Sequence, residues 1–373
     1  MPDLDVVSLA KELINIQSVS RHSNVPVTDF IETWLAPIGF EIERLEYIDE
    51  NDQRKANLIA KLGEGRGGVA LCSHSDTVPG QEDQWPAFEA AVKDGRLYGR
   101  GSCDMKGPLA ATMITAATID ATALKQPLYI IVTADEELGL HGAKYVAEHS
   151  EILREAHPHY GIIAEPTQLV PVNAHKGYAD IYATAYGVAA HTSTGKGESS
   201  TFQVAFFMAD MARLAEQLKT DKSFMNEAFV PPTNGFNMIV DDGNCAINVT
   251  ASQTTVGISF RTMPDSRADE LIAMIIEAAE KYGLETRMSH DPILHTPPEA
   301  TIIQTACDLT GNAAPQVVSY STDGVHLQHR IDELVVLGPG DIALAHTVGE
   351  FIPVSELEAS VGIYQQMIER LCM

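Results

Sequence analysis

Apolar and polar positions in the first half of the chain follow two alternating patterns. Apolar residues three or four apart predict amphipathic helices, and short, nearly continuous apolar runs predict buried strands. The helical pattern covers 4–16, 27–39, 107–119 and 142–150, and the strand pattern covers 40–48, 55–63, 67–74, 127–134 and 160–165. This alternation predicts an α/β fold in which helices flank a mainly parallel central sheet.

The pattern changes after residue 175. Residues 178–188 alternate strongly between polar and apolar positions, which is typical of a strand with one buried face. A helix, two strands, a helix and a strand are then predicted, at 201–218, 235–240, 254–262, 266–283 and 284–290. The resulting order, β-α-β-β-α-β, is that of a ferredoxin-like α+β unit.

The α/β pattern returns towards the end of the chain. A helix, two strands and a closing helix are predicted at 299–311, 315–321, 333–340 and 355–372. The sequence therefore predicts a split catalytic domain, formed by residues 1–175 and 286–373. Residues 176–285 would form a smaller domain inserted between its two halves.

Net charge and cysteine content indicate which binding partners and which cell compartment to expect. The formal net charge is −26, and such a surface repels phosphates and anionic headgroups, so neither nucleic acid nor a membrane is expected to bind. The five cysteines are scattered and form no C-x-x-C pair, which favours a reducing compartment. The start of the chain lacks the basic residues of a signal peptide, and no apolar run approaches a membrane span. We expect a cytoplasmic enzyme.

Chemically reactive side chains follow several of the predicted strands. Ligands of open α/β sheets bind beyond the carboxyl ends of the strands, so these side chains are expected to converge at one edge. They are His74, Asp76, Asp104, Asp135, Glu136, Glu137, Glu165 and His346.

A metal site explains this convergence. Several buried carboxylates are very costly unless cations neutralise them. Two imidazoles with three acids suit zinc, or cobalt or manganese, and the number of acids favours two metals bridged by one carboxylate. His74 and Asp76 point to the same side of their strand, so Asp76 would accept the ring N–H of His74. Of the adjacent Glu136 and Glu137, one would bind metal and the other would act as general base.

Each residue also has a purely structural interpretation. Asp104 precedes a predicted helix and would serve as its N-cap. The acidic run 135–137 would complement a helix dipole, and Glu165-Pro166 would form an ordinary turn. The convergence of all these groups favours the metal site.

Several segments resemble the co-catalytic zinc peptidase family, which includes acetylornithine deacetylases, succinyl-diaminopimelate desuccinylases, glutamate carboxypeptidases and dipeptidases. The resemblance spans nearly the whole chain and is greatest to the acetylornithine deacetylase branch. The segments are "SHSDTVP", "LYGRGSCDMKGPLAA", "TADEELG", "EPTQLVPVNAHKG" and "VLGPGDIALAH".

The resemblance implies a role for each group at the sheet edge. His74 and Glu165 would hold one metal, Glu137 and His346 would hold the other, and Asp104 would bridge the two. Glu136 would be the general base, and the peptide after Asp104 would be cis.

The resemblance also implies that the inserted domain is a lid through which two subunits pair. His191 would reach the active site of the partner subunit and donate to the oxyanion. Arg261 and Asn248 would contact the substrate carboxylate. Asp323 and Gly324 lie in a segment expected near the substrate, and this segment matches neither the deacetylase nor the desuccinylase pattern fully.

These features together predict a hydrolase that uses two metal ions to cleave the amide bond of an N-acyl amino acid, with N-acetylornithine as the best candidate. A dipeptidase, an aminoacylase and a succinyl-diaminopimelate desuccinylase are the alternatives among enzymes. A catalytically silent, metal-binding dimer is the alternative from another class.

Overall fold

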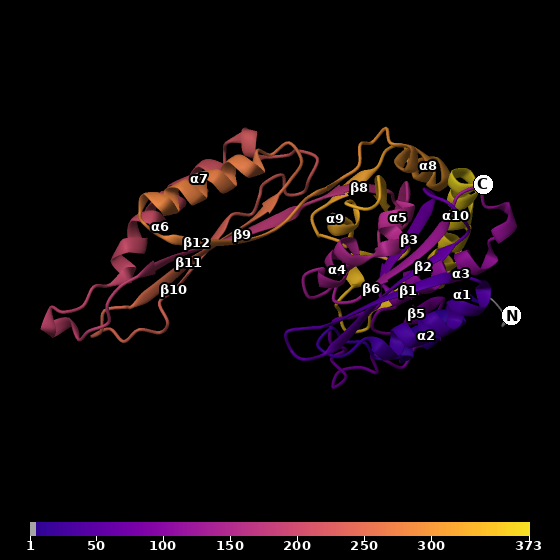
Figure 1. The fold of residues 1–373 in the computed structure, drawn as a ribbon, viewed down its shortest axis with the longest axis horizontal. Helices are drawn as coiled ribbons and strands as arrows, with labels where there is room; N and C mark the ends of the chain where they lie inside the picture. The colour runs from indigo at the N-terminus through magenta and orange to yellow at the C-terminus, as the bar shows by residue number, and fades with distance from the viewer. Residues whose placement is uncertain (1–4) are drawn as a thin grey trace. The chain divides into compact units, whose positions relative to one another are not determined.

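The computed structural model describes residues 5–373, which form two compact units (Figure 1). The larger unit comprises 5–174, 295–316 and 322–373, and the smaller one comprises 175–294 and 317–321. Residues 1–4, with which the first predicted domain and helix begin, lie outside the described residues. The predicted border at 285 differs from the structure, in which the smaller unit extends to Leu294. The reason is that the strand at 285–291 pairs along its whole length with the first strand of the smaller unit.

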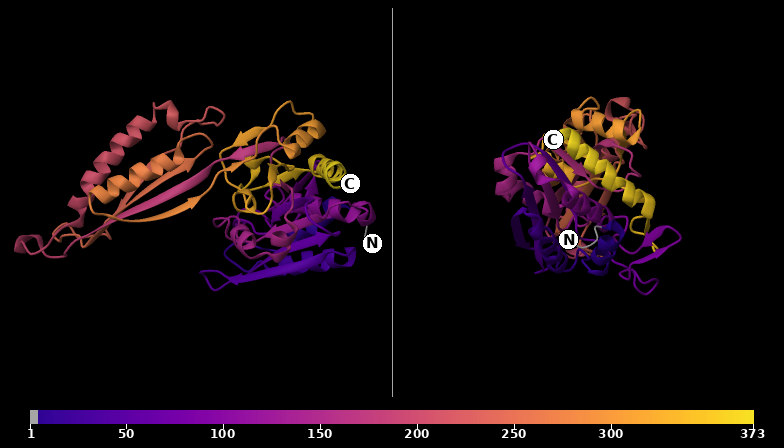
Figure 2. Two further views of the ribbon diagram at one scale, coloured as in Figure 1. Left: turned by 45° about the horizontal axis from the view of Figure 1, so that its top comes forward. Right: turned by 90° about the vertical axis from the view of Figure 1, so that its right-hand side faces the viewer.

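A nine-stranded sheet forms the centre of the larger unit (Figures 1 and 2). The four adjacent strands β6, β3, β7 and β15 run parallel, and antiparallel strands flank them on both sides, which confirms the predicted mainly parallel sheet. In spatial order the strands are β1 (Glu41–Ile48), β2 (Arg54–Leu62), β6 (Leu128–Thr133), β3 (Val69–His74), β7 (Tyr160–Ile163), β15 (Glu333–Val336), β8 (Val172–His175) and β13 (Leu294–His295), and β14 (Gln316–Val318) pairs with β8.

Helices cover both faces of this sheet. One face packs into the main hydrophobic core, in which Leu71 and Ile130 are fully buried against side chains of α1, α3, α8 and α10. Because strand side chains alternate, Ile131 points to the other face, where α4 contacts β2 and β6. The helices are α1 (Val6–Asn15), α2 (Val25–Leu35), α3 (Lys106–Thr118), α4 (His141–His149), α5 (Glu151–Ala156), α8 (Thr301–Thr310), α9 (Gly324–Leu327) and α10 (Val354–Cys372).

A small antiparallel sheet completes the larger unit. It was not predicted, because its strands have only three residues each. These strands are β16 (Phe351–Pro353), β5 (Arg96–Tyr98) and β4 (Ala91–Lys93).

The smaller unit is a four-stranded antiparallel sheet with two helices packed on one face. Ile181 and Ile258 point from the sheet into a core that includes Phe207 and Ile275 of the helices. The predicted β-α-β-β-α-β order is confirmed: β9 (Gly177–Tyr186), α6 (Ser200–Leu218), β10 (Asn237–Asp241), β11 (Gln253–Thr262), α7 (Ala268–Lys281) and β12 (Glu285–Asp291). None of the helices within residues 5–373 is long and apolar enough to cross a membrane.

Candidate metal centre

The four parallel strands end at one edge of the sheet, and candidate site residues follow each of them. His74 is the last residue of β3, and Glu165 comes two residues after the end of β7. Residues 135–137 follow β6, and His346 lies in the loop after β15. The structure therefore brings these side chains together where the positions of the strand ends predicted.

Asp104 lies between the two histidines. Its Oδ1 is 3.0 Å from Nε2 of His74, and its Oδ2 is 3.2 Å from Nε2 of His346. The alternative that Asp104 caps α3 is wrong, because the N-cap is Met105 and no side chain caps this helix. The peptide between Asp104 and Met105 is cis, as expected.

Two groups of metal-ligand type share Asp104. One consists of His74, Asp104 and Glu165, with His74 Nε2 3.6 Å from Glu165 Oε1. The other consists of Asp104, Glu137 and His346, with His346 Nε2 3.0 Å from Glu137 Oε2. Each group offers donor atoms that all lie within 4.8 Å of one another. Imidazole nitrogen with carboxylate oxygen is a donor set that suits divalent transition metals, so these residues fit two metal ions.

The electrostatics of the centre reflect its burial. Burial raises the pKa of Glu165 and of Glu136 well above the usual range, because charged forms are disfavoured there. Hydrogen bonds to Asp104 and Glu137 raise the pKa of His346 to about 10. Burial alone would lower the pKa of His74, but its contacts with Asp104 and Asp76 raise it well above its ordinary value. A cation at each site would replace these protons.

Asp76 makes more contacts than were predicted for it. Nδ1 of His74 lies 3.1 Å from the backbone carbonyl of Asp76 and 3.5 Å from its carboxylate, so the carbonyl is the nearer acceptor. The carboxylate of Asp76 accepts the hydroxyl of Ser20 at 2.6 Å and the backbone N–H groups of Glu136 and Glu137 at 3.2 and 3.3 Å. Asp76 therefore also holds the turn that carries the two glutamates.

Glu136 and Glu137 differ in their surroundings. Glu137 contacts His346, whereas Glu136 belongs to neither ligand group among residues 5–373. Glu136 still lies beside the centre, because its backbone N–H donates to Asp76 and the next residue is Glu137. The charges of His74 and Glu165 act on its carboxylate. A carboxylate beside two metal positions, without being needed as a ligand, is suited to proton transfer.

Asp323 is buried beside the centre, and Gly324 begins α9. Thr133 donates a hydrogen bond to Oδ2 of Asp323, whereas Oδ1 has no partner within the described part of the chain. Burial raises the pKa of this carboxyl to about 7. The predicted contact of Asp323 and Gly324 with substrate stays a prediction.

Candidate residues of the smaller unit form two separate sets. His191 and Asn248 are neighbours, because the backbone at His191 pairs with Val249 and Thr192 N–H donates to the Asn248 carbonyl at 2.9 Å. Arg261 lies near the other end of β11, opposite Tyr178 at the start of β9. All three side chains are exposed.

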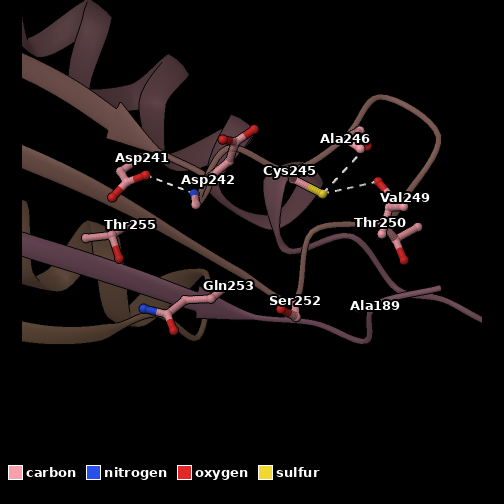
Figure 3. Close-up of a pocket in the computed structure, with 11 residues that line it drawn as sticks. Ala189, Asp241, Asp242, Cys245, Ala246, Val249, Thr250, Ser252, Gln253 and Thr255 are labelled. Carbon is pink, nitrogen blue, oxygen red and sulfur yellow. Dashed lines mark hydrogen bonds between the residues drawn. The ribbon is translucent and has the colours of Figure 1, made fainter. Parts of the chain in front are cut away.

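A pocket of about 480 Å³ opens beside the first set (Figure 3). Its lining includes Ala189, Ala246 and Val249, so it adjoins both the His191 segment and the loop that carries Asn248. Cys245 turns its sulfur towards the Val249 carbonyl, at 3.4 Å.

Two buried ion pairs support the centre and were not predicted. Lys55 donates to Asp135 at 2.5 Å and to the carbonyls of Ser20 and His22. Arg100 donates to Glu350, also at 2.5 Å. Neither pair has a signal in the sequence, because the partners lie 80 and 250 positions apart and become neighbours only in the folded chain.

Comparison with protein families matches residues 70–370 to Peptidase family M20/M25/M40. The chain belongs to this family. Among curated relatives, the acetylornithine deacetylase of Myxococcus xanthus is 32% identical over 97% of this chain and 96% of its own length. That of Proteus mirabilis is 33% identical over 98% of this chain and 97% of its own. The chain is accordingly a metal-dependent amidohydrolase.

Solved structures share the fold of this M20 chain. The aminopeptidase PepT of Bacillus cereus has a TM-score of 0.70 at 20% identity, covering 98% of this chain and 97% of that chain. A metallo-carboxypeptidase of the M20 family from Sulfolobus solfataricus also has a TM-score of 0.70, at 15% identity, with 99% of both chains covered. A dinuclear metal-binding peptidase of the M20 family from Bacillus subtilis has a TM-score of 0.67 at 16% identity, over 98% of this chain and 97% of its own.

Proposed function

We propose that this M20 hydrolase removes the acyl group of N-acyl amino acids, with N-acetylornithine as its best substrate. The observation that carries the proposal is the pair of ligand groups that share Asp104, in a chain that resembles acetylornithine deacetylases over nearly its full length. The products would be acetate and a free amino acid.

The metals would be held by five side chains. His74 and Glu165 would bind one ion, Glu137 and His346 the other, and Asp104 would bridge them. We favour zinc, with cobalt and manganese as alternatives, because nitrogen and carboxylate donors suit these ions better than calcium. Two such ions, when bound, lower the pKa of a water and polarise the carbonyl of the scissile amide.

Glu136 would be the general base of the reaction. Its carboxylate is close to the ligand groups without being one of their members, so it is free to accept the proton of the attacking water. The same carboxylate would then deliver that proton to the leaving amine. Asp76 would keep Glu136 in place through the backbone N–H that it accepts, and would also orient His74.

The smaller unit would act as a lid and would pair two subunits into a homodimer. His191 and Asn248 are separated from Arg261 by most of β11, which is roughly 27 Å at the rise of an extended strand. A small amino acid cannot span that distance, so both sets can contact one substrate only if they come from different subunits. His191 would therefore donate to the oxyanion in the partner's site, with Asn248 beside it, and Arg261 would bind the substrate carboxylate within its own subunit.

Exposed apolar side chains on the smaller unit support pairing. Phe202 and Phe206 on α6 are 77% and 65% exposed, and Ile239 and Val240 lie on the edge strand β10 at 60% and 49%. Apolar side chains of this size are usually covered at an interface. We also place the protein in the cytoplasm, which is consistent with its five free cysteines.

A peptidase activity is the second candidate, because similar solved structures include an aminopeptidase and a metallo-carboxypeptidase. A panel of substrates separates the candidates: N-acetyl, N-succinyl and N-formyl amino acids and dipeptides, each tested with zinc, cobalt and manganese. The proposal expects the largest kcat/KM for N-acetylornithine. A dipeptide or an N-succinyl substrate with a larger kcat/KM would overturn it, and no turnover with any metal would support a silent metal-binding dimer.

A further inference from the structure

Glu350 is a fully buried carboxylate in the loop that carries His346. Its Oε1 accepts the backbone N–H groups of Cys103 at 2.8 Å and Asp104 at 3.0 Å. Its Oε2 accepts Nη1 of Arg100 at 2.5 Å. One side chain thus joins the segment of the shared ligand Asp104 to the loop of the second histidine.

Main-chain contacts join the same two segments. The carbonyl of Glu350 accepts the N–H of Gly99 at 3.1 Å, and Sγ of Cys103 donates to the carbonyl of Asp341 at 3.3 Å. Gly340 approaches so closely that a Cβ there would lie 2.7 Å from the Cys103 sulfur. Segment 99–104 and segment 340–350 therefore pack as one assembly, and Glu350 provides its charged contacts.

A contribution to the free energy of unfolding does not by itself explain the ion pair of Glu350 with Arg100. Both side chains are almost completely buried, and Nε and Nη2 of Arg100 have no hydrogen-bond partner within residues 5–373, although the guanidinium lies over the Trp85 ring at 5.8 Å. Apolar residues of similar volume are often at least as stabilising as a buried ion pair. They cannot, however, accept two adjacent backbone N–H groups.

The N–H groups of Cys103 and Asp104 need an acceptor other than the Asp104 side chain. Its two oxygens face His74 and His346 instead. With no side chain capping α3, the carboxylate that accepts the Asp104 N–H comes from Glu350. Glu350 thus holds the backbone of Asp104, while the carboxylate of Asp104 remains directed at the two histidines.

We propose that Glu350 is a positioning residue of the metal centre, which fixes the backbone of Asp104 so that its two carboxylate oxygens face His74 and His346, the histidines that would each hold one ion. Arg100 orients the Glu350 carboxylate by donating Nη1 to its Oε2. This inference rests on the ligand assignment of the proposed function. It does not depend on the identity of the substrate.

The test is the affinity of the metal-free protein for zinc, measured by titration of Glu350→Gln and of wild type. Glutamine keeps the shape but cannot accept both backbone N–H groups and the guanidinium at once. Outer contacts of metal ligands typically contribute 10- to 100-fold in affinity, so we expect zinc to bind about 10- to 100-fold more weakly. Glu333→Gln is the matched control, because Glu333 also accepts a backbone N–H, that of Ile302, but lies at the start of β15. Affinity equal to that of this control and of wild type would overturn the proposal.

A double variant separates positioning from charge balance. Arg100→Met with Glu350→Met removes both charges of this buried pair at similar volume, so its metal-free fold should be retained even if Glu350→Gln alone unfolds. It also leaves no side-chain oxygen that could accept the N–H groups of Cys103 and Asp104. We expect its zinc affinity to stay low, whereas a return to the wild-type value would show that Glu350 merely balances Arg100. His346→Ala provides the baseline, because it should bind about one ion fewer than wild type. If wild type bound no zinc, the proposed function would fail as well, whereas normal binding by both Glu350 variants would refute the positioning role alone.

Discussion

Removal of the metals should destabilise the larger unit selectively. Both ligand groups lie in that unit, and residues of the smaller unit contribute to neither. Ions that bind only the folded state stabilise it by mass action. A chelator should therefore lower the melting temperature of the larger unit and leave that of the smaller unit unchanged, so the molecule contains its own control.

The expected size of this effect follows from two occupied sites. An ion at about 100 times its Kd contributes about 2.7 kcal/mol to the free energy of unfolding, so two ions contribute about 5 kcal/mol. For a domain of roughly 150–250 residues, 1 kcal/mol changes the melting temperature by about 2–4 °C. The chelator should thus lower the melting temperature of the larger unit by about 10–20 °C.

The effect should also depend on pH, with a sign fixed by the pKa values of the metal-free centre. The pKa of Asp323 is raised from 3.8 to about 7, and that of His346 from 6.5 to about 10. Glu136 and Glu165 are shifted in the same direction. Between about pH 5.5 and 8.5 the folded protein then binds more protons than the unfolded chain, so the metal-free protein loses stability as the pH rises. Metal binding displaces protons from the ligands, so the stabilisation by metal should increase over the same range.

Differential scanning calorimetry at about pH 5.5, 7 and 8.5, with and without saturating zinc, measures the melting temperature of each unit and its dependence on pH. We expect zinc to raise the melting temperature of one of two transitions only, by an amount that increases with pH. A shift that is equal at all three pH values, or one that affects both transitions equally, would refute the assignment of the buried carboxylates and histidines to the metal centre.

Three substitutions test individual roles. Glu136→Gln should retain both ions but lose about 10²–10⁴-fold in kcat, since it removes only proton transfer; a kcat near wild type, measured at saturating substrate, would exclude it as the base. His346→Ala should bind about one ion fewer by elemental analysis, and unchanged stoichiometry would show that another residue is the ligand. His191→Ala should lower kcat about 10²–10³-fold. Mixed dimers of His191→Ala with Glu136→Gln subunits should regain activity, because one of their two sites is complete; dimers without regained activity would place His191 in its own subunit's site.

The sequence allowed the fold and much of the centre to be predicted, because both follow from local patterns. The apolar runs along the chain predicted strands at β3, β6, β7 and β15, and neighbouring parallel strands end at the same edge of a sheet. His74 and Glu165 follow directly from those strand ends.

Contacts between distant segments could not be predicted. Asp104 was equally compatible with a helix cap until the structure placed it between two histidines. The carboxylate of Asp76 accepts the N–H groups of Glu136 and Glu137, 60 and 61 positions away, and no periodicity reports such a contact. The border of the smaller unit was set at 285, inside the strand predicted at 284–290, whereas β12 pairs with β9 along its whole length.

The most direct test of the dinuclear hydrolase is a titration of the metal-free protein with zinc, in which bound metal and release of acetate from N-acetylornithine are measured together. We predict that hydrolysis is absent from the metal-free protein and reaches its plateau at about two ions per chain. Hydrolysis without metal, or a plateau at one ion with the second adding neither binding nor activity, would contradict it.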